Sequence, residues 1–190
     1  YTADYYYVKF FDSDNGVIVC GYAKSNDTNE SSRIYSTSNG GESWDIVGSG
    51  PATNIIKGVV YVSSDVGFFC YDYVEGMDSN LYKTDDGGKT FAKVMLEEQE
   101  LDSSAANPQG QETETKTDSG KNGADSSEQL RWGDVYKEAL TPVVDSTGII
   151  TIYLTQGKNA VYNDGKTAAK YQSSDKGSTW KYIGQVEIKD

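Results

Sequence analysis

The stretch TDDGGKTF at residues 84–91 decides the fold of this chain, because two other segments repeat its pattern. TSNGGESW occupies residues 37–44 and SSDKGSTW occupies residues 173–180, so all three match S/T-x-D/N-x-G-x-S/T-W/F. The first two copies begin 47 residues apart, at positions 37 and 84, and the third follows a longer interval that holds an insertion. Recurrence at a period of about 20–50 residues indicates a repeat architecture.

Each copy of this motif has the residues of a tight turn. The Asp or Asn at the third position can accept hydrogen bonds from amides of its own turn, and the glycine at the fifth position supplies the positive φ that the turn needs. We expect the final aromatic ring to fold back onto the sheet. We therefore interpret the motif residues as structural: Thr37, Asn39, Gly41, Trp44, Thr84, Asp86, Gly88, Phe91, Ser173, Asp175, Gly177 and Trp180.

An apolar segment precedes each motif, at residues 17–20, 68–70 and 149–154. Nearly continuous apolar runs of this length are typical of strands buried on both faces. In each unit a strand and a turn come before the apolar strand, and a third strand, the motif and a fourth strand follow it. Four antiparallel strands in each unit are the signature of a β-propeller blade. The sequence thus predicts an all-β fold of three four-stranded antiparallel blades, over residues 7–48, 58–95 and 139–188.

Three blades do not close a ring, because propellers typically have about four to eight. We predict that residues 1–190 form a single partial propeller, completed by sequence outside them or by another copy of the chain. Mutual stacking of the blades would bury the apolar strands.

The stretch between the second and third blades breaks the repeat. Residues 97–128 contain nine acidic residues, two lysines and no aromatic residue. Such a composition cannot bury enough apolar surface to offset the entropy of ordering. We expect an acidic low-complexity insertion that is solvated, with a short helical turn near residues 96–101. It is either an inert loop or an acidic binding tail, and composition favours the loop.

The chain resembles the Asp-box, or bacterial neuraminidase repeat, family of sialidase-like β-propellers, whose motif is S-x-D-x-G-x-T-W. Asn39 and Phe91 depart from that motif. The resemblance implies that the motif turns lie on the outer rim of the blades, away from any ligand site. For sialidases of the family it also implies three arginines that grip a carboxylate, a Tyr–Glu nucleophile pair and an Asp acid/base.

A three-arginine clamp cannot be built here, because Arg33 and Arg131 are the two arginines of the chain. Lysine is a poor substitute for the planar guanidinium. The chain has no histidine, which removes the commonest general base and most zinc sites. We therefore predict no catalytic residues, cofactor or metal within this segment. The triplet Asp12, Asp14 and Gly16 resembles a calcium loop, but an ordinary turn is the favoured interpretation, since the remaining ligands are absent.

The charge of the chain limits its partners. It has 17 Lys and Arg residues against 29 Asp and Glu residues, a net charge of −12. This balance argues against nucleic acid and anionic membrane surfaces, and no apolar run reaches the roughly 18 residues that span a bilayer. A basic or neutral partner, either glycan or protein, remains.

The blade topology places the variable loops together, at residues 24–32, 74–80 and 156–166, at the end opposite the motif turns. Binding sites usually lie on loops of this kind. Trp132, Tyr136 and Tyr162 lie in or beside them and are the candidate ligand-binding residues, since sugar rings stack on such side chains. The alternative is that these aromatic rings pack against a blade.

Two classes of function follow. The favoured one is a non-catalytic binding or scaffolding module of a secreted or cell-surface Asp-box protein. The alternative is part of a sialidase-like glycoside hydrolase whose catalytic residues lie mostly outside this segment. Similarity to Asp-box propellers that assist photosystem assembly is weaker, because those are expected to use an arginine-rich patch.

The two cysteines, Cys20 and Cys70, lie on the apolar strands of neighbouring blades. We place them at equivalent positions of sheets that pack about 10 Å apart, which is too far for a disulfide. We therefore predict two buried, unbonded thiols.

Overall fold

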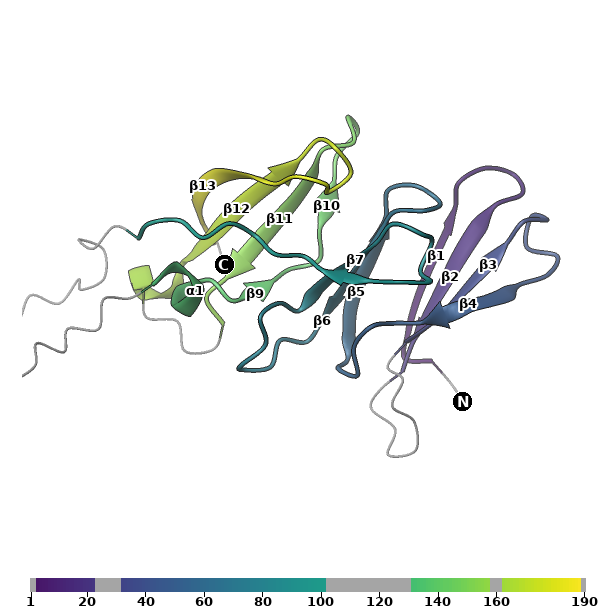
Figure 1. Ribbon diagram of the computed structural model, residues 1–190, viewed down its shortest axis with the longest axis horizontal. Coiled ribbons are helices and arrows are strands. Elements are labelled where there is room, and N and C mark those ends of the chain that lie inside the picture. The colour runs from purple at the N-terminus through teal and green to yellow at the C-terminus, as the bar shows by residue number, and fades with distance from the viewer. Residues whose placement is uncertain (1–2, 23–31, 102–130, 158–161, 189–190) are drawn as a thin grey trace, which may run out of the picture.

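The computed structural model describes residues 3–22, 32–101, 131–157 and 162–188, which form three antiparallel sheets standing side by side (Figure 1). Blade 1 has the strand order β1-β2-β3-β4 and blade 2 the order β5-β6-β7-β8. Blade 3 has the order β10-β11-β12-β13, with the short β9 also paired to β11. The predicted all-β fold of three four-stranded antiparallel blades is confirmed.

The strands of blade 1 are β1 (Tyr5–Phe10), β2 (Gly16–Gly21), β3 (Ser32–Thr37) and β4 (Asp45–Ser49). Those of blade 2 are β5 (Ile56–Tyr61), β6 (Gly67–Tyr71), β7 (Leu81–Thr84) and β8 (Ala92–Lys93). Blade 3 contains β9 (Glu138–Ala139), β10 (Val143–Val144), β11 (Ile150–Thr155), β12 (Thr167–Ser173) and β13 (Lys181–Glu187). Two short helices complete it, α1 (Trp132–Val135) and the 3-10 turn η2 (Tyr162–Gly165).

Blade 2 lies between the other two and is buried on both faces. All five residues of β6 are buried, as its continuous apolar sequence predicts. Phe69 and Tyr71 belong to the core that blade 2 shares with blade 1. Phe68 and Cys70 belong to the core shared with blade 3. Alternation along one strand therefore supplies two separate interfaces.

The first strand of blade 3 is interrupted. Ala139 pairs with Leu154, whereas Val143 pairs with Thr151, so the register shifts by one residue between β9 and β10. Pro142, which has no N–H to donate, lies in the gap. The interruption turns the backbone of β9 toward blade 2.

The repeated motif forms the same turn in all three blades. In blade 2, Thr90 N–H and Lys89 N–H donate to Oδ1 of Asp86 (2.9 and 3.0 Å), and the Thr90 hydroxyl donates to its Oδ2 (2.6 Å). The Thr84 hydroxyl donates to the same carboxylate (2.8 Å) and accepts from Gly88 N–H (2.8 Å).

Blade 1 keeps the turn with Asn39 in place of the acid. Ser43 N–H donates to Asn39 Oδ1 (3.0 Å), as in the other turns. The amide Nδ2 of Asn39 then donates to the Ser43 hydroxyl (2.8 Å), which reverses the direction of the last bond. A neutral amide therefore satisfies the same geometry.

The motif turns also contact the first turn of their own blades. Gly40 N–H donates to Asp14 O (2.9 Å) and Gly87 N–H donates to Asp65 O (2.8 Å). In blade 1, both carboxylate oxygens of Asp12 accept from Asn15, and Oδ1 also accepts from Asp14 N–H. The triplet that resembles a calcium loop thus has the hydrogen bonds of a turn.

The cysteines are unbonded, as predicted, but their predicted positions were wrong in one respect. Gly16 pairs with Thr37 and Gly67 pairs with Thr84, the first residues of their motifs, so Gly16 and Gly67 are equivalent. Cys70, three residues after Gly67, is therefore equivalent to Val19 of blade 1 and not to Cys20. Cys20 faces away from blade 2 and is half-buried. Burial among apolar residues raises the pKa of the Cys70 thiol to about 11.

The start of the acidic insertion contacts blade 3, although the side chains of Glu97, Glu98 and Glu100 are exposed. The Tyr171 hydroxyl donates to Glu97 O (2.6 Å), and Leu96 and Leu101 contact the aromatic cluster of blade 3. Residues 94–101 run without helical structure, so the expected helical turn is absent there. The rest of the insertion lies outside the described residues.

The motif carboxylates make stability depend on pH. Hydrogen bonds from Thr90 hold the pKa of Asp86 far below its ordinary value of 3.8, and bonds from Thr179 do the same for Asp175. A depressed folded-state pKa contributes stability that is complete above the unfolded pKa and is lost as pH falls below it. We expect the melting temperature to drop steeply below about pH 4. Asp175→Asn should flatten this drop in a calorimetric pH series; an unchanged slope would contradict it.

Candidate functional site

The candidate site lies along the seam between blades 2 and 3, where the side chains of Asn80 and Cys70 reach the backbone of Ala139. Asn80, which is buried, accepts from Ala139 N–H (2.8 Å) and donates to Ala139 O (2.9 Å). Its Nδ2 also donates to Tyr71 O (2.8 Å) within blade 2. The amide of Asn80 therefore pairs with β9 as a neighbouring strand would.

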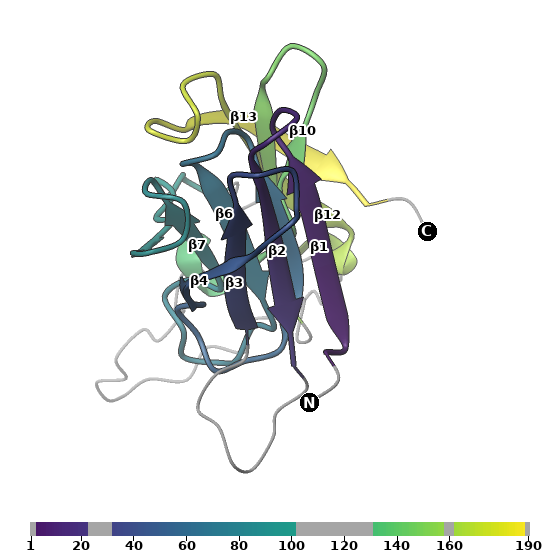
Figure 2. The ribbon, with the colours of Figure 1, turned by 90° about the vertical axis from the view of Figure 1, so that its right-hand side faces the viewer.

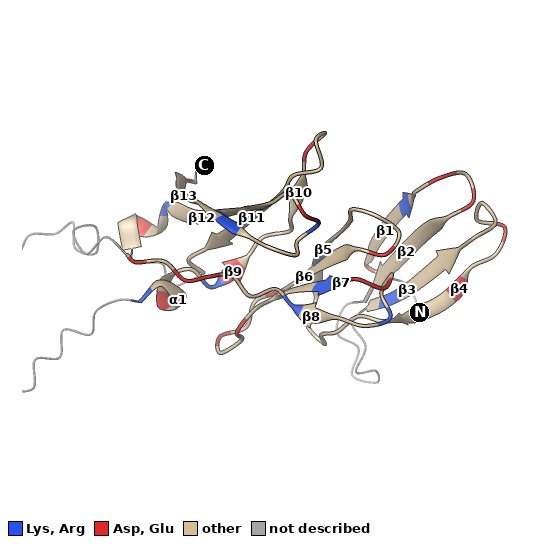
Figure 3. Ribbon diagram, turned by 45° about the horizontal axis from the view of Figure 1, so that its top comes forward, with Lys and Arg blue, Asp and Glu red and all other residues tan. Residues whose placement is uncertain are grey.

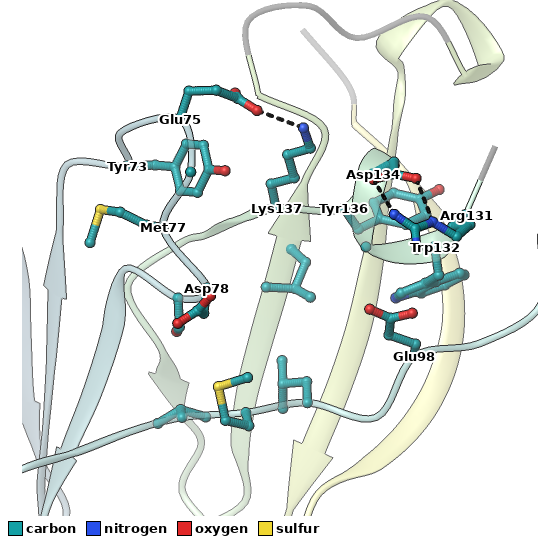
Figure 4. A pocket seen from close by; sticks show the side chains of 17 residues that line it. Tyr73, Glu75, Met77, Asp78, Glu98, Arg131, Trp132, Asp134, Tyr136 and Lys137 are labelled. Atoms are coloured by element: carbon teal, nitrogen blue, oxygen red, sulfur yellow. Dashed lines mark hydrogen bonds and ion pairs between the residues drawn. The ribbon is translucent and has the colours of Figure 1, made fainter. Parts of the chain in front are cut away.

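Beside this contact the two blades diverge and leave a cleft of about 410 Å³ (Figure 4). The loop between β6 and β7 forms one wall, α1 forms the other, and the segment after β8 crosses the base. Lys137, just ahead of β9, lies between the walls, where its Nζ donates to Glu75 of the opposite wall (2.8 Å). The walls thus come from two blades and from the insertion that separates them.

The structure brings the three predicted ligand-binding residues together in one aromatic cluster. The ring centroids of Trp132 and Tyr136 are 4.6 Å apart, and those of Tyr136 and Tyr162 are 6.2 Å apart. Trp132 and Tyr136 line the cleft, whereas Tyr162 lies outside its lining. The three side chains are 4%, 3% and 1% exposed, so they form the packed support of the cleft. Their direct contact with a ligand stays a prediction.

Flexible apolar side chains line the accessible part of the cleft. Met77 projects from the wall of blade 2, while Met95 and Leu96 come from the segment after β8. Met95 is largely exposed. Unbranched methionine side chains adapt to differently shaped partners, and they are common at binding surfaces that accept varied sequences.

The lining carries more negative than positive charge. Its four acids are Glu75, Asp78, Glu98 and Asp134, against Arg131 and Lys137. Three of these acids are paired within hydrogen-bond distance: Glu75 with Lys137, Asp78 with Lys93, and Asp134 with Arg131. Glu98 has no ion-pair or hydrogen-bond partner among the described residues. Acidic and basic residues elsewhere are spread over the strands and loops of all three blades (Figure 3).

One polar group at the α1 side of the cleft remains available to a ligand. In Figure 4 the Glu98 carboxylate, which is exposed, lies beside Trp132. The indole Nε1 of Trp132 has no hydrogen-bond partner in the described part of the chain, but it is buried, so a ligand does not reach it in this conformation. The Tyr171 hydroxyl is near this ring, but it lies outside hydrogen-bonding geometry with the indole and donates to Glu97 O instead.

Sequence reasoning missed most of this site. Asn80 falls in the loop range 74–80 that was marked as variable, yet nothing local indicates that its partner is Ala139, 59 residues further on. Met77 also falls in that range. Glu98 was assigned to a solvated insertion. Its neighbour Leu101, the one large aliphatic residue of the insertion, was the signal that this end of the segment packs.

Within the described ranges, no group of three His, Cys, Asp or Glu side chains is arranged to hold a metal ion. None of the described helices is long and apolar enough to cross a membrane.

The chain is similar in structure to two solved proteins, although no family model and no curated protein matches it. A GH74 enzyme from Niastella koreensis aligns with 88% of this chain at 16% identity and a TM-score of 0.43. The structure described as YCF48 bound to D1 peptide aligns with 92% of it at 15% identity and a TM-score of 0.32. The matches cover 19% of the first protein and 66% of the second. The sheet topology, rather than these distant likenesses, carries the fold assignment.

Removal of the Asn80 side chain should weaken the seam between blades 2 and 3, which its apolar core still holds together. Asn80→Ala leaves the N–H and C=O of Ala139 buried without these partners, which we expect to lower the free energy of unfolding by about 3 kcal/mol. Asn80→Asp keeps the acceptor but loses both donors, so it should also destabilise. Urea denaturation measures both variants, and a loss below about 1 kcal/mol for Asn80→Ala would show that the seam does not depend on this contact.

Proposed function

We propose that this chain is an Asp-box propeller module that binds a segment of another protein in the cleft between blades 2 and 3. The observation that carries this proposal is the combination of adaptable apolar walls with the exposed, unpaired Glu98 carboxylate. The complementary partner is an extended peptide with an apolar side chain next to a basic one. Its apolar group would contact Met77 and Met95, and its cation would pair with Glu98.

A peptide fits this cleft better than a glycan does. Sugar rings stack on open aromatic faces, but Trp132 and Tyr136 are almost completely buried. Basic and aliphatic side chains of a peptide match the groups that remain accessible, Glu98 and Met95. The net charge of −12 on the whole chain also favours a basic protein partner through electrostatic steering.

Hydrolysis is less well supported by the cleft. A general acid needs a raised pKa, which apolar surroundings or a neighbouring carboxylate would produce. The hydrogen bond from Lys93 lowers the pKa of Asp78, and the hydrogen bond from Arg131 lowers that of Asp134. The pKa of each carboxyl group is therefore shifted in the direction opposite to the one that a general acid requires. We keep secretion or display at the cell surface as part of the proposal.

Selection of random peptides displayed on phage, with the immobilised chain as bait, tests this function. We expect enrichment of peptides that place Lys or Arg beside Leu, Ile, Met or Phe. For a synthetic peptide of the enriched sequence, Glu98→Lys should weaken binding about tenfold or more, because it replaces an attractive charge with a repulsive one.

Glu42→Lys is the matched control, since it makes the same charge change on an exposed residue of the blade 1 motif turn. This variant should bind the peptide as the unaltered chain does. Equal affinity of the Glu98→Lys chain, or a set of selected peptides without basic residues, would refute the proposed site.

A further inference from the structure

Each blade has one face turned toward the preceding blade in the sequence, here called its leading face, and one turned toward the next, its trailing face. The structure contains two complete interfaces of this kind. The trailing face of blade 1 covers the leading face of blade 2, and the trailing face of blade 2 covers the leading face of blade 3. These interfaces show what a leading face requires in order to be covered.

Both interfaces place an apolar side chain of the preceding blade against the glycine of the next motif turn. Ile34 of blade 1 lies against Gly88, and Phe68 of blade 2 lies against Gly177. Any side chain at either glycine would collide with these groups. In blade 3 the motif residue Trp180 also packs edge-on against Phe68. A motif turn is therefore a contact surface for the blade before it.

Side chains of the preceding blade also form hydrogen bonds with the backbone at the edge of a leading face. Val59 N–H donates to the Tyr5 hydroxyl and Tyr61 N–H donates to the Tyr7 hydroxyl, both at 3.0 Å. Lys9 Nζ donates to Tyr61 O (2.6 Å). Three alternating residues of β1 thus satisfy the open edge of β5, whose other edge pairs with β6.

Blade 1 has the same leading face without a blade against it (Figure 2). The register makes Tyr6, Val8 and Phe10 equivalent to Ile56, Val59 and Tyr61. The residues of blade 2 are buried, whereas Val8 is 55% exposed and Phe10 is 45% exposed. Tyr6 and Ile46 are also largely exposed. Apolar side chains that recur at interface positions mark an interaction surface.

The motif turn of blade 1 has a glycine and an aromatic residue at the positions that contact the preceding blade in blades 2 and 3. Trp44, the equivalent of Trp180, makes an edge contact with Phe10 of its own blade (5.9 Å between centroids). Gly41 is the equivalent of Gly88 and Gly177, and the side chains of Phe10 and Trp44 are its neighbours. By the same register, the N–H groups of Val8 and Phe10 correspond to those of Val59 and Tyr61.

The trailing face of blade 3 differs from the other two trailing faces. Thr151 replaces Val17 and Phe68, and Lys170 replaces Ile34 and Leu81, at positions that are buried in blades 1 and 2. Gln172 Nε2 donates to the Thr151 hydroxyl across this face (3.1 Å). A lysine in an apolar interface loses its hydration unless it gains an acceptor there, as Lys9 does at Tyr61 O. With Thr151 and Lys170, the trailing face of blade 3 is less complementary to the apolar leading face of blade 1 than the trailing faces of blades 1 and 2 are.

We infer that the leading face of blade 1 is the docking surface of a further blade of the same repeat. The trailing face of that blade carries apolar residues at the positions of Val17, Val19 and Ile34. Hydroxyl groups on its first strand accept from the N–H groups of Val8 and Phe10. Stacking therefore extends from the leading face of blade 1 rather than from the trailing face of blade 3, where Thr151 and Lys170 lie beside Val143.

The inference can be tested by adding a blade of known sequence to the complete chain. A copy of residues 3–50 placed directly before Tyr1 separates its Gly50 from Tyr6 by five residues, as Gly50 and Ile56 are separated in the chain itself. We expect this added blade to raise the melting temperature by about 5 °C or more. The same copy placed after Asp190 is the matched control and should leave the melting temperature unchanged.

Phe10→Lys in the original blade 1 distinguishes docking from a nonspecific effect of the extra blade. It should abolish the increase in the extended chain, whereas in the unextended chain it removes only the contacts of Phe10 with Trp44 and the glycines of its own blade. An added blade that remains sensitive to protease, or equal stabilisation by both copies, would overturn the inference. So would a dimer of the unextended chain that Phe10→Lys dissociates in sedimentation, because it would assign the face to a second copy.

Discussion

Side chains, rather than paired strands, close the seams between the three sheets. Among the described residues no backbone hydrogen bond joins two blades, so the open edges of β5 and β9 depend on the neighbouring blade for their partners. Tyr5 and Tyr7 supply them at the first seam, and Asn80 supplies them at the second. Buried backbone groups must be paired, so this requirement fixes how far apart the blades stand and how they are aligned.

The two seams differ because the chain crosses them differently. A short connection joins blade 1 to blade 2, and aromatic rings of both blades fill the space between them. At the second seam the long insertion separates the blades in sequence, and α1 packs its aromatic cluster against blade 3. Asn80 holds one side of this seam closed, while α1 keeps the other side apart. The cleft is the result of these two opposed contacts.

The repeated motif and the apolar strands could be predicted from sequence because their interactions are local. Thr84, Asp86 and Thr90 bond to one another within a single turn, so seven residues contain all the information. Strand β6 has no polar residue, and burial on both faces follows directly.

The seam contacts could not be predicted, because each joins residues more than 50 positions apart. The alternating tyrosines of β1 indicate a common face but not the strand edge that they meet. The prediction that Cys20 and Cys70 occupy equivalent positions was wrong for a related reason, because a one-residue error in register moves a side chain to the opposite face. Trp132, Tyr136 and Tyr162 were correctly associated with one another, but their burial depends on α1 and on the segment after β8.

Native-state hydrogen exchange of individual amides tests most directly whether side chains close these seams. If side chains close the seams, the amides of Val59, Tyr61 and Ala139 exchange only through global unfolding, although each donates to a side chain and not to a strand. The amides of Val8 and Phe10, at the equivalent open edge of blade 1, should exchange many times faster. Exchange of Val59 and Ala139 as fast as that of Val8 would contradict the account.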